Sequence, residues 1–216
     1  MNSVPNPIPV EQWTALGVSR ESLARLETLV SVALAWQERI NLISPSTIPE
    51  IWKRHVLDSA QLLPFLPVNT ARIADLGSGG GFPGLVLAAT TKAEIHMFES
   101  NGKKVSFLQE ALRKMGVKAQ VHRTRLEQNL APVDMPEVQA VTARAFAPLG
   151  ELLGYASPFM ARGAPGLFHK GQDIDTELTE AAKAWTITYQ KHSSLTDSQS
   201  VILEVKEIAH VIPKRA

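Results

Sequence analysis

The spacing of hydrophobic residues changes about a third of the way along the chain. Before residue 64, apolar residues recur every three or four positions, which predicts amphipathic helices over 20–41 and 48–63. Ser19 stands where the first helix needs an N-cap, and Pro64 follows the second. The segment "PFLP" (64–67) is expected to link an N-terminal helical extension, 1–66, to a second domain, 67–216.

After this linker, short apolar runs alternate with helical stretches. The apolar runs predict strands at 71–76, 93–98, 117–122, 138–143 and 164–169. The stretches between and after them predict helices at 83–90, 101–115, 148–161 and 174–184. Such alternation predicts a parallel, doubly wound α/β sheet. The last two predicted strands, 185–191 and 201–208, are joined by a polar turn without a helix, so an antiparallel hairpin completes a seven-stranded, mostly parallel sheet.

The first predicted strand runs into a glycine-rich loop, "DLGSGGGFPG" (75–84). Bare backbone at a strand end suits a phosphate, a dinucleotide or S-adenosylmethionine. Gly79, Gly81 and Gly84 satisfy G-x-G-x-x-G, a pattern that several cofactors share. A phosphate-binding P-loop is excluded, because no Lys-Ser or Lys-Thr pair follows the glycines.

Two features favour S-adenosylmethionine over a nicotinamide dinucleotide. Asp75 stands two residues before Gly77, and a carboxylate there would repel a pyrophosphate but attract an ammonium and a sulfonium. The terminal hairpin also suits a methyltransferase sheet better. Glu99, at the end of the second strand, can bind the ribose hydroxyls of either cofactor. The alternative functions are an NAD-dependent oxidoreductase and a non-catalytic nucleotide-binding module.

The residue types present, and those absent, limit the reactions that this chain can catalyse. The 216 residues include no cysteine, which excludes disulfides and the cysteine nucleophile used to methylate pyrimidine carbon-5. The segment "TARAFAPL" (142–149) stands where an amine-methylating Asn/Asp-Pro-Pro-Tyr/Phe motif would lie. Guanine N7 is a target without a proton to remove, so catalysis there needs no general base, and we expect positioning by Arg144. No metal site is expected. No apolar run is long enough to cross a membrane, and a cytoplasmic monomer is expected.

The net charge of +1 is unevenly distributed. Residues 102–125 hold seven basic side chains against the single acidic Glu110, a pattern that suits nucleic acid or a solvated helix face. The side chains proposed to contact RNA are Asn41, Arg54, His55, Lys103, Lys104, Arg123 and Lys170, with Lys53 nearby. Three residues have structural alternatives: a helix cap for Asn41, a pair with Asp58 for His55, and a buried ion pair for Arg144.

Seven segments together resemble the bacterial family of 16S rRNA guanine-N7 methyltransferases, RsmG or GidB. They are "WQERINLIS" (36–44), "RHVLDSAQL" (54–62), "DLGSGGGFPG" (75–84), "ESNGKKVSFL" (99–108), "RLE" (125–127), "ARAFAPL" (143–149) and "HKG" (169–171). The resemblance covers about residues 35–210 and implies a class I methyltransferase, Rossmann-like domain with an N-terminal helical extension. It implies methylation of the guanine at conventional position 527, in 16S rRNA or the small ribosomal subunit.

The resemblance also implies roles for individual residues. Gly77, with Gly79, and Phe82 would line the methionine and adenosine pocket, and Glu99 would hold the ribose. Leu126 and Glu127 would contact adenine. Arg144 would lie at the cleft between cofactor and target.

Overall fold

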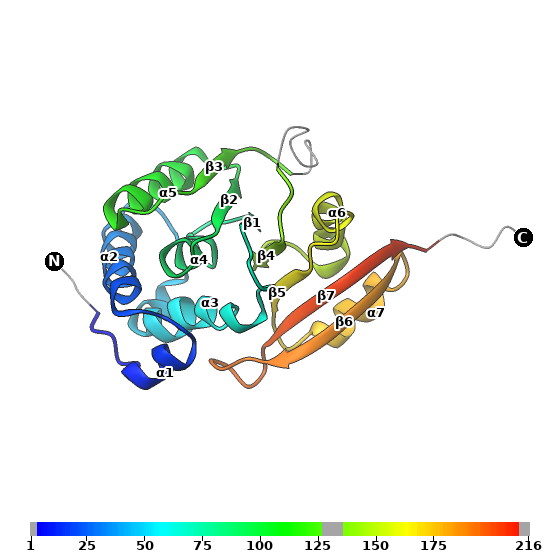
Figure 1. Cartoon of the computed structure of the whole chain (residues 1–216), viewed down its shortest axis with the longest axis horizontal. Coiled ribbons are helices and arrows are strands. Elements are labelled where there is room, and N and C mark those ends of the chain that lie inside the picture. The colour runs from blue at the N-terminus through cyan, green and yellow to red at the C-terminus, as the bar shows by residue number, and fades with distance from the viewer. Residues whose placement is uncertain (1–3, 127–135, 212–216) are drawn as a thin grey trace, which may run out of the picture.

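A computed structural model describes residues 4–126 and 136–211 as helices around one central sheet (Figure 1). The seven strands lie in the order β3 (Gln120–Arg123), β2 (Glu94–Glu99), β1 (Arg72–Leu76), β4 (Ala140–Arg144), β5 (Gly166–Lys170), β7 (Val201–His210) and β6 (Trp185–Ser193). The first five are parallel. β7 pairs antiparallel with both β5 and β6, which confirms the predicted mostly parallel seven-stranded sheet with a terminal hairpin.

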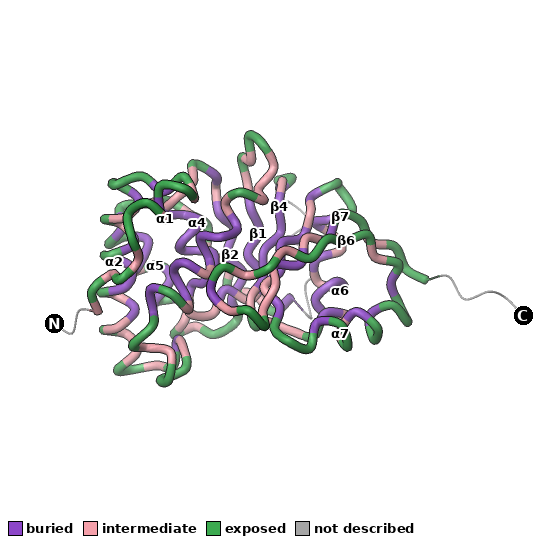
Figure 2. Tube along the Cα trace, turned by 90° about the horizontal axis from the view of Figure 1, so that it is seen from below, coloured by how far each residue is buried: buried purple, intermediate pink, exposed green. Residues whose placement is uncertain are grey.

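Helices cover both faces of the sheet. On one face lie α4 (Gly84–Thr90) and α5 (Gly102–Met115), with α2 (Arg20–Gln37) packed outside them; on the other lie α6 (Leu149–Met160) and α7 (Ile174–Ala181) (Figure 1). Each layer has its own hydrophobic core, and the buried residues concentrate between sheet and helices (Figure 2). Both faces of β1, β2, β4 and β5 are therefore buried, which explains their continuous apolar runs, whereas the edge strand β3 is partly exposed.

The N-terminal region is more broken than its hydrophobic spacing predicts. It contains α1 (Val10–Ala15), α2, the 3-10 helix η1 (Pro45–Glu50), the π-helix η2 (Trp52–Leu57), α3 (Asp58–Ala60) and the 3-10 helix η3 (Leu63–Phe65). The predicted helix 20–41 ends at Gln37, whose amide binds the backbone beyond it: Oε1 accepts from the N–H groups of Leu42 and Ile43, and Nε2 donates to the Ile43 carbonyl. This side chain turns residues 38–43 out of the helix.

These N-terminal elements share a hydrophobic core with the sheet. Trp13 and Trp52, both buried, meet edge to face and belong to the same apolar cluster as Ile73 of β1 and Phe107 of α5. Trp185 is also buried, as expected for core tryptophans. The division at residue 66 remains a prediction, but elements between residues 4 and 66 pack directly on the α4–α5 layer.

The parallel strands bring the candidate residues to one edge. The glycine loop follows β1, Glu99 ends β2, and Arg144 ends β4, so all three lie at the carboxyl edge where open α/β sheets bind ligands. Among the described residues, no helix combines the length and the apolar character that crossing a membrane requires.

Candidate functional site

Two adjoining cavities open at the carboxyl edge of the sheet. The smaller, about 320 Å³, lies between the glycine loop, the end of β2 and residues 124–126. The larger, about 860 Å³, lies between residues 42–58, the ends of β4 and β5, and the turn between β6 and β7. Both volumes are within the usual range of small-molecule sites, about 300–1,000 Å³. Four residues line both cavities: Leu42, Arg144, Ala145 and Phe146.

The glycine loop presents bare backbone to the smaller cavity. Gly77 has φ +65°, and a Cβ there would overlap the ring of Phe146. Gly79 has φ +52°, and a Cβ there would meet only Gly77 O at 3.6 Å and Lys104 Nζ at 3.9 Å. Both positions need the left-handed conformation that glycine adopts at little cost. The loop is fixed to β2 by a hydrogen bond from Ser78 N–H to Phe98 O (3.0 Å).

Glu99 faces this loop from the end of β2. Its Oε2 accepts from Gly79 N–H at 2.9 Å and its Oε1 accepts from Asn101 N–H at 2.7 Å. The residue is 9% exposed and lines the smaller cavity. Each carboxylate oxygen has a second lone pair. The carboxylate is therefore held rigidly, with acceptor capacity left for a pair of hydroxyl groups.

Some of the other residues predicted to bind the cofactor also line the smaller cavity. Phe82 and Leu126 line it, with Phe82 only 3% exposed and the Arg144 guanidinium carbon 5.3 Å from its ring centroid. Glu127 lies outside the described residues.

The structure corrects the expectation that Asp75 contacts a cofactor. Its side chain is fully buried and lines neither cavity. Oδ1 accepts from the Thr142 hydroxyl at 2.8 Å, and Oδ2 lies so close to α4 that a Cβ on Gly84 would approach it to 2.5 Å. Burial raises the pKa of Asp75 to about 6, against the lowering effect of its hydrogen bonds. Asp75 thus ties β1 to β4 beneath the loop.

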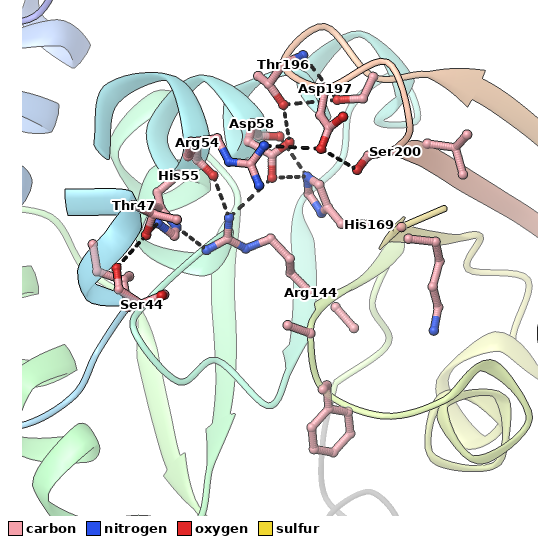
Figure 3. A pocket seen from close by; sticks show the side chains of 18 of the residues that line it. Ser44, Thr47, Arg54, His55, Asp58, Arg144, His169, Thr196, Asp197 and Ser200 are labelled. Atoms are coloured by element: carbon pink, nitrogen blue, oxygen red, sulfur yellow. Dashed lines mark hydrogen bonds and ion pairs between the residues drawn. The ribbon is translucent and has the colours of Figure 1, made fainter. Parts of the chain in front are cut away.

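Arg144 is the centre of a polar network in the wall of the larger cavity (Figure 3). Its Nη1 donates to the Arg54 carbonyl at 3.0 Å and to Asp58 Oδ2 at 3.2 Å, and its Nη2 donates to His55 Nδ1 at 2.7 Å. Most N–H groups of this guanidinium are therefore used by contacts within the protein, which include the ion pair with Asp58 that the structural alternative predicted. Its Nε–H and one Nη2–H have no protein partner among the described residues.

The same contacts fix the protonation of His55. Because an arginine can only donate, His55 Nδ1 must accept, so its proton is on Nε2 and is donated to Thr47 Oγ1 at 2.8 Å. The Thr47 hydroxyl in turn donates to the Ser44 carbonyl at 2.8 Å. Burial, together with the charges of Arg144 and Arg54, lowers the pKa of His55 to about 3. His55 is thus a neutral link between Arg144 and the 44–47 segment.

Asp58 joins four parts of the chain around the larger cavity. Its Oδ2 accepts from Arg144 on β4. Its Oδ1 accepts from Gln61 Nε2 at 2.8 Å and, at 2.7 Å, from the hydroxyl of Thr196, which lies in the β6–β7 turn. His169 on β5 donates from Nε2 to the Asp58 carbonyl at 2.7 Å. The turn is held a second time by Arg54, whose Nη1 lies 3.1 Å from Asp197 Oδ2 (Figure 3).

Three residues expected to contact RNA are placed differently from the prediction. Lys170 is 9% exposed, and its ammonium donates to Glu177 Oε2 at 2.7 Å and to the Ala147 carbonyl at 3.1 Å, so it holds the 145–149 segment. Both ring nitrogens of His55 are occupied within the network. Asn41 is exposed but lines neither cavity, and it follows the helix end by four residues instead of capping it.

The basic stretch 102–125 divides into two groups in space. Lys104 and Arg125 line the smaller cavity, Lys103 is exposed beside Lys104, and Arg123 ends β3 with its guanidinium against Gly102. Arg113 and Lys114 occupy the last turn of α5, ten residues after Lys103 and Lys104 and so about 15 Å away at 1.5 Å per residue. Only the first group lies at the site.

Several lining residues were not predicted as site residues. Leu42 and Ser44 come from "WQERINLIS", a segment in which only Asn41 had an assigned role, and Thr47 follows that segment by three residues. Phe146 and the β6–β7 turn were likewise unassigned. The turn is far away in sequence, and no pattern in it indicated contact with Asp58. The described residues hold no cluster of three or more His, Asp or Glu side chains suited to a metal ion.

The sheet order, the antiparallel seventh strand and the glycine loop define a class I methyltransferase fold. Solved structures agree: cofactor-bound Rv0187 from MTB superimposes with TM-score 0.58 at 16% identity, covering 94% of this chain and 98% of that one. A protein described as an O-methyltransferase from Klebsiella pneumoniae gives TM-score 0.57 at 12% identity, covering 91% and 94%. At these identities the likeness concerns the fold alone.

Within that class, the sequence identifies the family. The family model for rRNA small subunit methyltransferase G, GidB, matches residues 22–205. Ribosomal RNA small subunit methyltransferase G of Rhodospirillum rubrum is 48% identical over 192 residues, 88% of this chain and 93% of the relative. Its counterpart in Paramagnetospirillum magneticum is 45% identical over 201 residues, 93% and 96% respectively. The chain belongs to the rRNA small subunit methyltransferase G family, and the oxidoreductase alternative finds no support in these matches.

Proposed function

We propose that this protein transfers a methyl group from S-adenosylmethionine to N7 of a guanine in 16S rRNA, at conventional position 527. Family membership supports the reaction class. The observation that carries the proposal is the pair of contiguous cavities, because a methyl transfer needs a cofactor site and a target site that meet. We further propose that the enzyme acts as a monomer in the cytoplasm, on free 16S rRNA or the small subunit.

The smaller cavity fits S-adenosylmethionine by the chemistry of its lining. Glu99 would accept from both ribose hydroxyls, and the backbone at Gly77 and Gly79 can approach the methionine part closely. Leu126 and Phe82 supply apolar surface for the adenosine. The cofactor, when bound, supplies an electrophilic methyl group on a positively charged sulfur. Glu99 and the glycine loop are already held by hydrogen bonds, so little ordering of these groups is needed on binding.

Positioning is the catalytic task left to the protein. Guanine N7 has an in-plane lone pair and no proton, so no side chain has to act as a base. Arg144 cannot serve as one, because its guanidinium is bound to Asp58, His55 and the Arg54 carbonyl. Arg144 lines both cavities, so we propose that its two remaining N–H groups orient a carboxylate of the cofactor or the O6 atom of the guanine.

The test is methyl transfer followed by nucleoside analysis. Tritium from labelled S-adenosylmethionine should appear in small-subunit rRNA as base-sensitive 7-methylguanosine, with either protein-free rRNA or isolated 30S particles as acceptor. The single-turnover rate should be flat between pH 6 and 9, since no base titrates there. Tritium on an exocyclic amine or a ribose would refute the proposal. NAD, added in place of the cofactor, should leave the melting temperature unchanged, whereas S-adenosylmethionine should raise it.

A further inference from the structure

The boundary between the two cavities is the place where target and cofactor must meet. Of the four residues that line both cavities, Leu42 is aliphatic, Ala145 is small, and Arg144 is bound within its network. The fourth, Phe146, is an aromatic ring. A planar base that enters the larger cavity and reaches the smaller one must pass this ring.

The ring of Phe146 is held in place from several sides. It packs against the Cα of Gly77 so closely that a Cβ there would overlap it. The Tyr155 ring lies behind it, with 5.5 Å between the ring centroids and an interplanar angle of 52°. The next residue, Ala147, has its carbonyl bound by the buried ammonium of Lys170 at 3.1 Å. The 145–149 segment is therefore a fixed support.

The residue before it has an unusual backbone conformation. Ala145 has φ +50°, a region that costs a residue with a Cβ free energy and that persists where the surrounding structure imposes it. Ala145 follows the end of β4 and stands between Arg144, whose guanidinium joins the polar network, and Phe146, which lines both cavities. This local strain at a site supports a functional role for the side chain that follows.

Phe146 also differs from the other aromatic rings at the site in exposure. Phe82 and Phe98 line the smaller cavity but are 3% and 1% exposed, so their faces are covered by protein. Phe146 is partly exposed. Partial exposure at the cavity boundary leaves part of its surface free for a ligand.

Methyl transfer to N7 creates a positive charge on the guanine at this boundary. In the transfer, the N7–CH₃ bond forms as the S–CH₃ bond breaks, the electron pair of that bond stays on sulfur, and the positive charge moves to the purine; no proton moves. Of the four carboxylates that line the larger cavity, three pair with cations: Asp58 with Arg144, Glu177 with Lys170, and Asp197 with Arg54. The fourth, Asp173, is exposed to solvent at the start of α7. An aromatic face can stabilise a flat cation without a counter-charge.

We propose that Phe146 is a catalytic residue that stacks on the target guanine and stabilises the positive charge developing on it. The inference rests on the proposed function and adds to it the group that the guanine contacts. Stacking of a base on an aromatic side chain accounts for roughly 5- to 150-fold in binding. The cation–π part should appear in the rate of the chemical step, since the charge forms only there.

The test compares Phe146→Leu and Phe146→Tyr with a matched control, Phe65→Leu. Phe65 is also half-buried and stacked, on His192 with centroids 4.2 Å apart, but it lines neither cavity. We expect the single-turnover rate at saturating cofactor to fall about 10-fold or more in Phe146→Leu, on the scale of a stacked base. Phe146→Tyr keeps an aromatic face and should restore most of the rate lost in Phe146→Leu, and Phe65→Leu should stay within about 3-fold of the unmodified enzyme. Affinity for S-adenosylhomocysteine should change less than about 3-fold in each variant.

Fluorinated phenylalanines at position 146 provide a readout that a structural role would not move. Each added fluorine weakens the negative face of the ring at nearly constant shape, so the logarithm of the rate should fall steadily with fluorine number. A flat series, or a Phe146→Leu rate within 2-fold, would overturn the proposal. Loss of cofactor affinity large enough to explain the rate would also overturn it, by assigning the ring to the cofactor. If the proposed function were wrong, the unmodified enzyme would form no 7-methylguanosine.

Discussion

At the scale of single residues, the backbone conformation at Gly77 and the contact with Phe146 both require a residue without a side chain. Gly77→Ala adds a Cβ at φ +65° and against the Phe146 ring. Gly116→Ala is a matched control, because Gly116 has φ +67° and nothing within 4 Å of a Cβ. Gly116→Ala should lose about 1–2 kcal/mol in the free energy of unfolding, and Gly77→Ala should lose more, because its Cβ also displaces the Phe146 ring. Only Gly77→Ala should lose cofactor affinity by calorimetry; equal affinity in the two variants would remove this loop from the cofactor site.

Asp75 should make stability depend on pH. Burial raises its folded pKa to about 6, above the value near 3.9 of an unfolded aspartate. The folded state therefore binds more protons between about pH 4 and 6, and the free energy of unfolding falls as pH rises through that window. Relative to the unmodified protein, Asp75→Asn should gain on the order of 3 kcal/mol from pH 4 to pH 8. Urea unfolding at both pH values measures this, with exposed Asp173→Asn as control; parallel pH profiles would contradict it.

The residues that sequence located well are those whose place follows from a strand end. Gly77 and Glu99 could be assigned because loops after parallel strands gather at one edge. Lys170 also ends a strand, but its role depends on Glu177, a partner on α7 that no spacing rule identified. For Asp75, the sequence suggested a charge near the cofactor, whereas the pleat turns this side chain into the layer beneath the loop.

At the scale of elements, the walls of the larger cavity depend on Asp58. Asp58→Ala should lower the free energy of unfolding by about 3–5 kcal/mol, because it leaves the buried Arg144 guanidinium without its counter-charge. Thr196→Val removes only one hydrogen bond to the same carboxylate and should cost about 1 kcal/mol. Denaturant unfolding compares the two. Equal losses would mean that the hairpin contact, and not the ion pair, holds these elements together.

Prediction of whole elements succeeded where the hydrophobic period was long and regular. All seven strands and helices α4 to α7 lie within a few residues of their predicted positions. The helix predicted over 48–63 breaks into 3-10, π and α segments, a change that the apolar period alone does not encode. Helix α2 stops early because the Gln37 side chain replaces helical hydrogen bonds with bonds to residues 42 and 43.

At the scale of the whole molecule, the N-terminal helices are part of the site and not an appendage. Residues 42–58 supply walls to both cavities, and the hydrophobic core beneath them is continuous with the α4–α5 layer. The sequence predicted a helical extension but gave no sign that its loops would meet the β6–β7 turn. Contacts between residues more than 130 positions apart, such as Thr196 with Asp58, depend on tertiary packing.

The distribution of charge over α5 indicates which surface meets RNA. Lys103 and Lys104 occupy the first turn, whose backbone N–H groups already bind Asn101 Oδ1, and no acidic residue stands there. Cations are unfavourable at a helix N-terminus by about 0.3–1 kcal/mol, so a binding function would explain their presence. Arg113 and Lys114, in the last turn, are placed favourably for the helix and lie away from the cavities.

Two double variants separate these roles. Lys103→Gln with Lys104→Gln should raise the melting temperature slightly, by relieving the helix dipole, yet weaken RNA binding. If each lysine neutralises one phosphate, the slope of log affinity against log salt should become shallower by about 0.7–0.9 per lysine. Arg113→Gln with Lys114→Gln should do the reverse, lowering stability slightly and leaving the slope unchanged. Filter binding of small-subunit rRNA from 50 to 300 mM salt decides between them, and identical slopes in the two variants would show that RNA does not lie along the cavity end of α5.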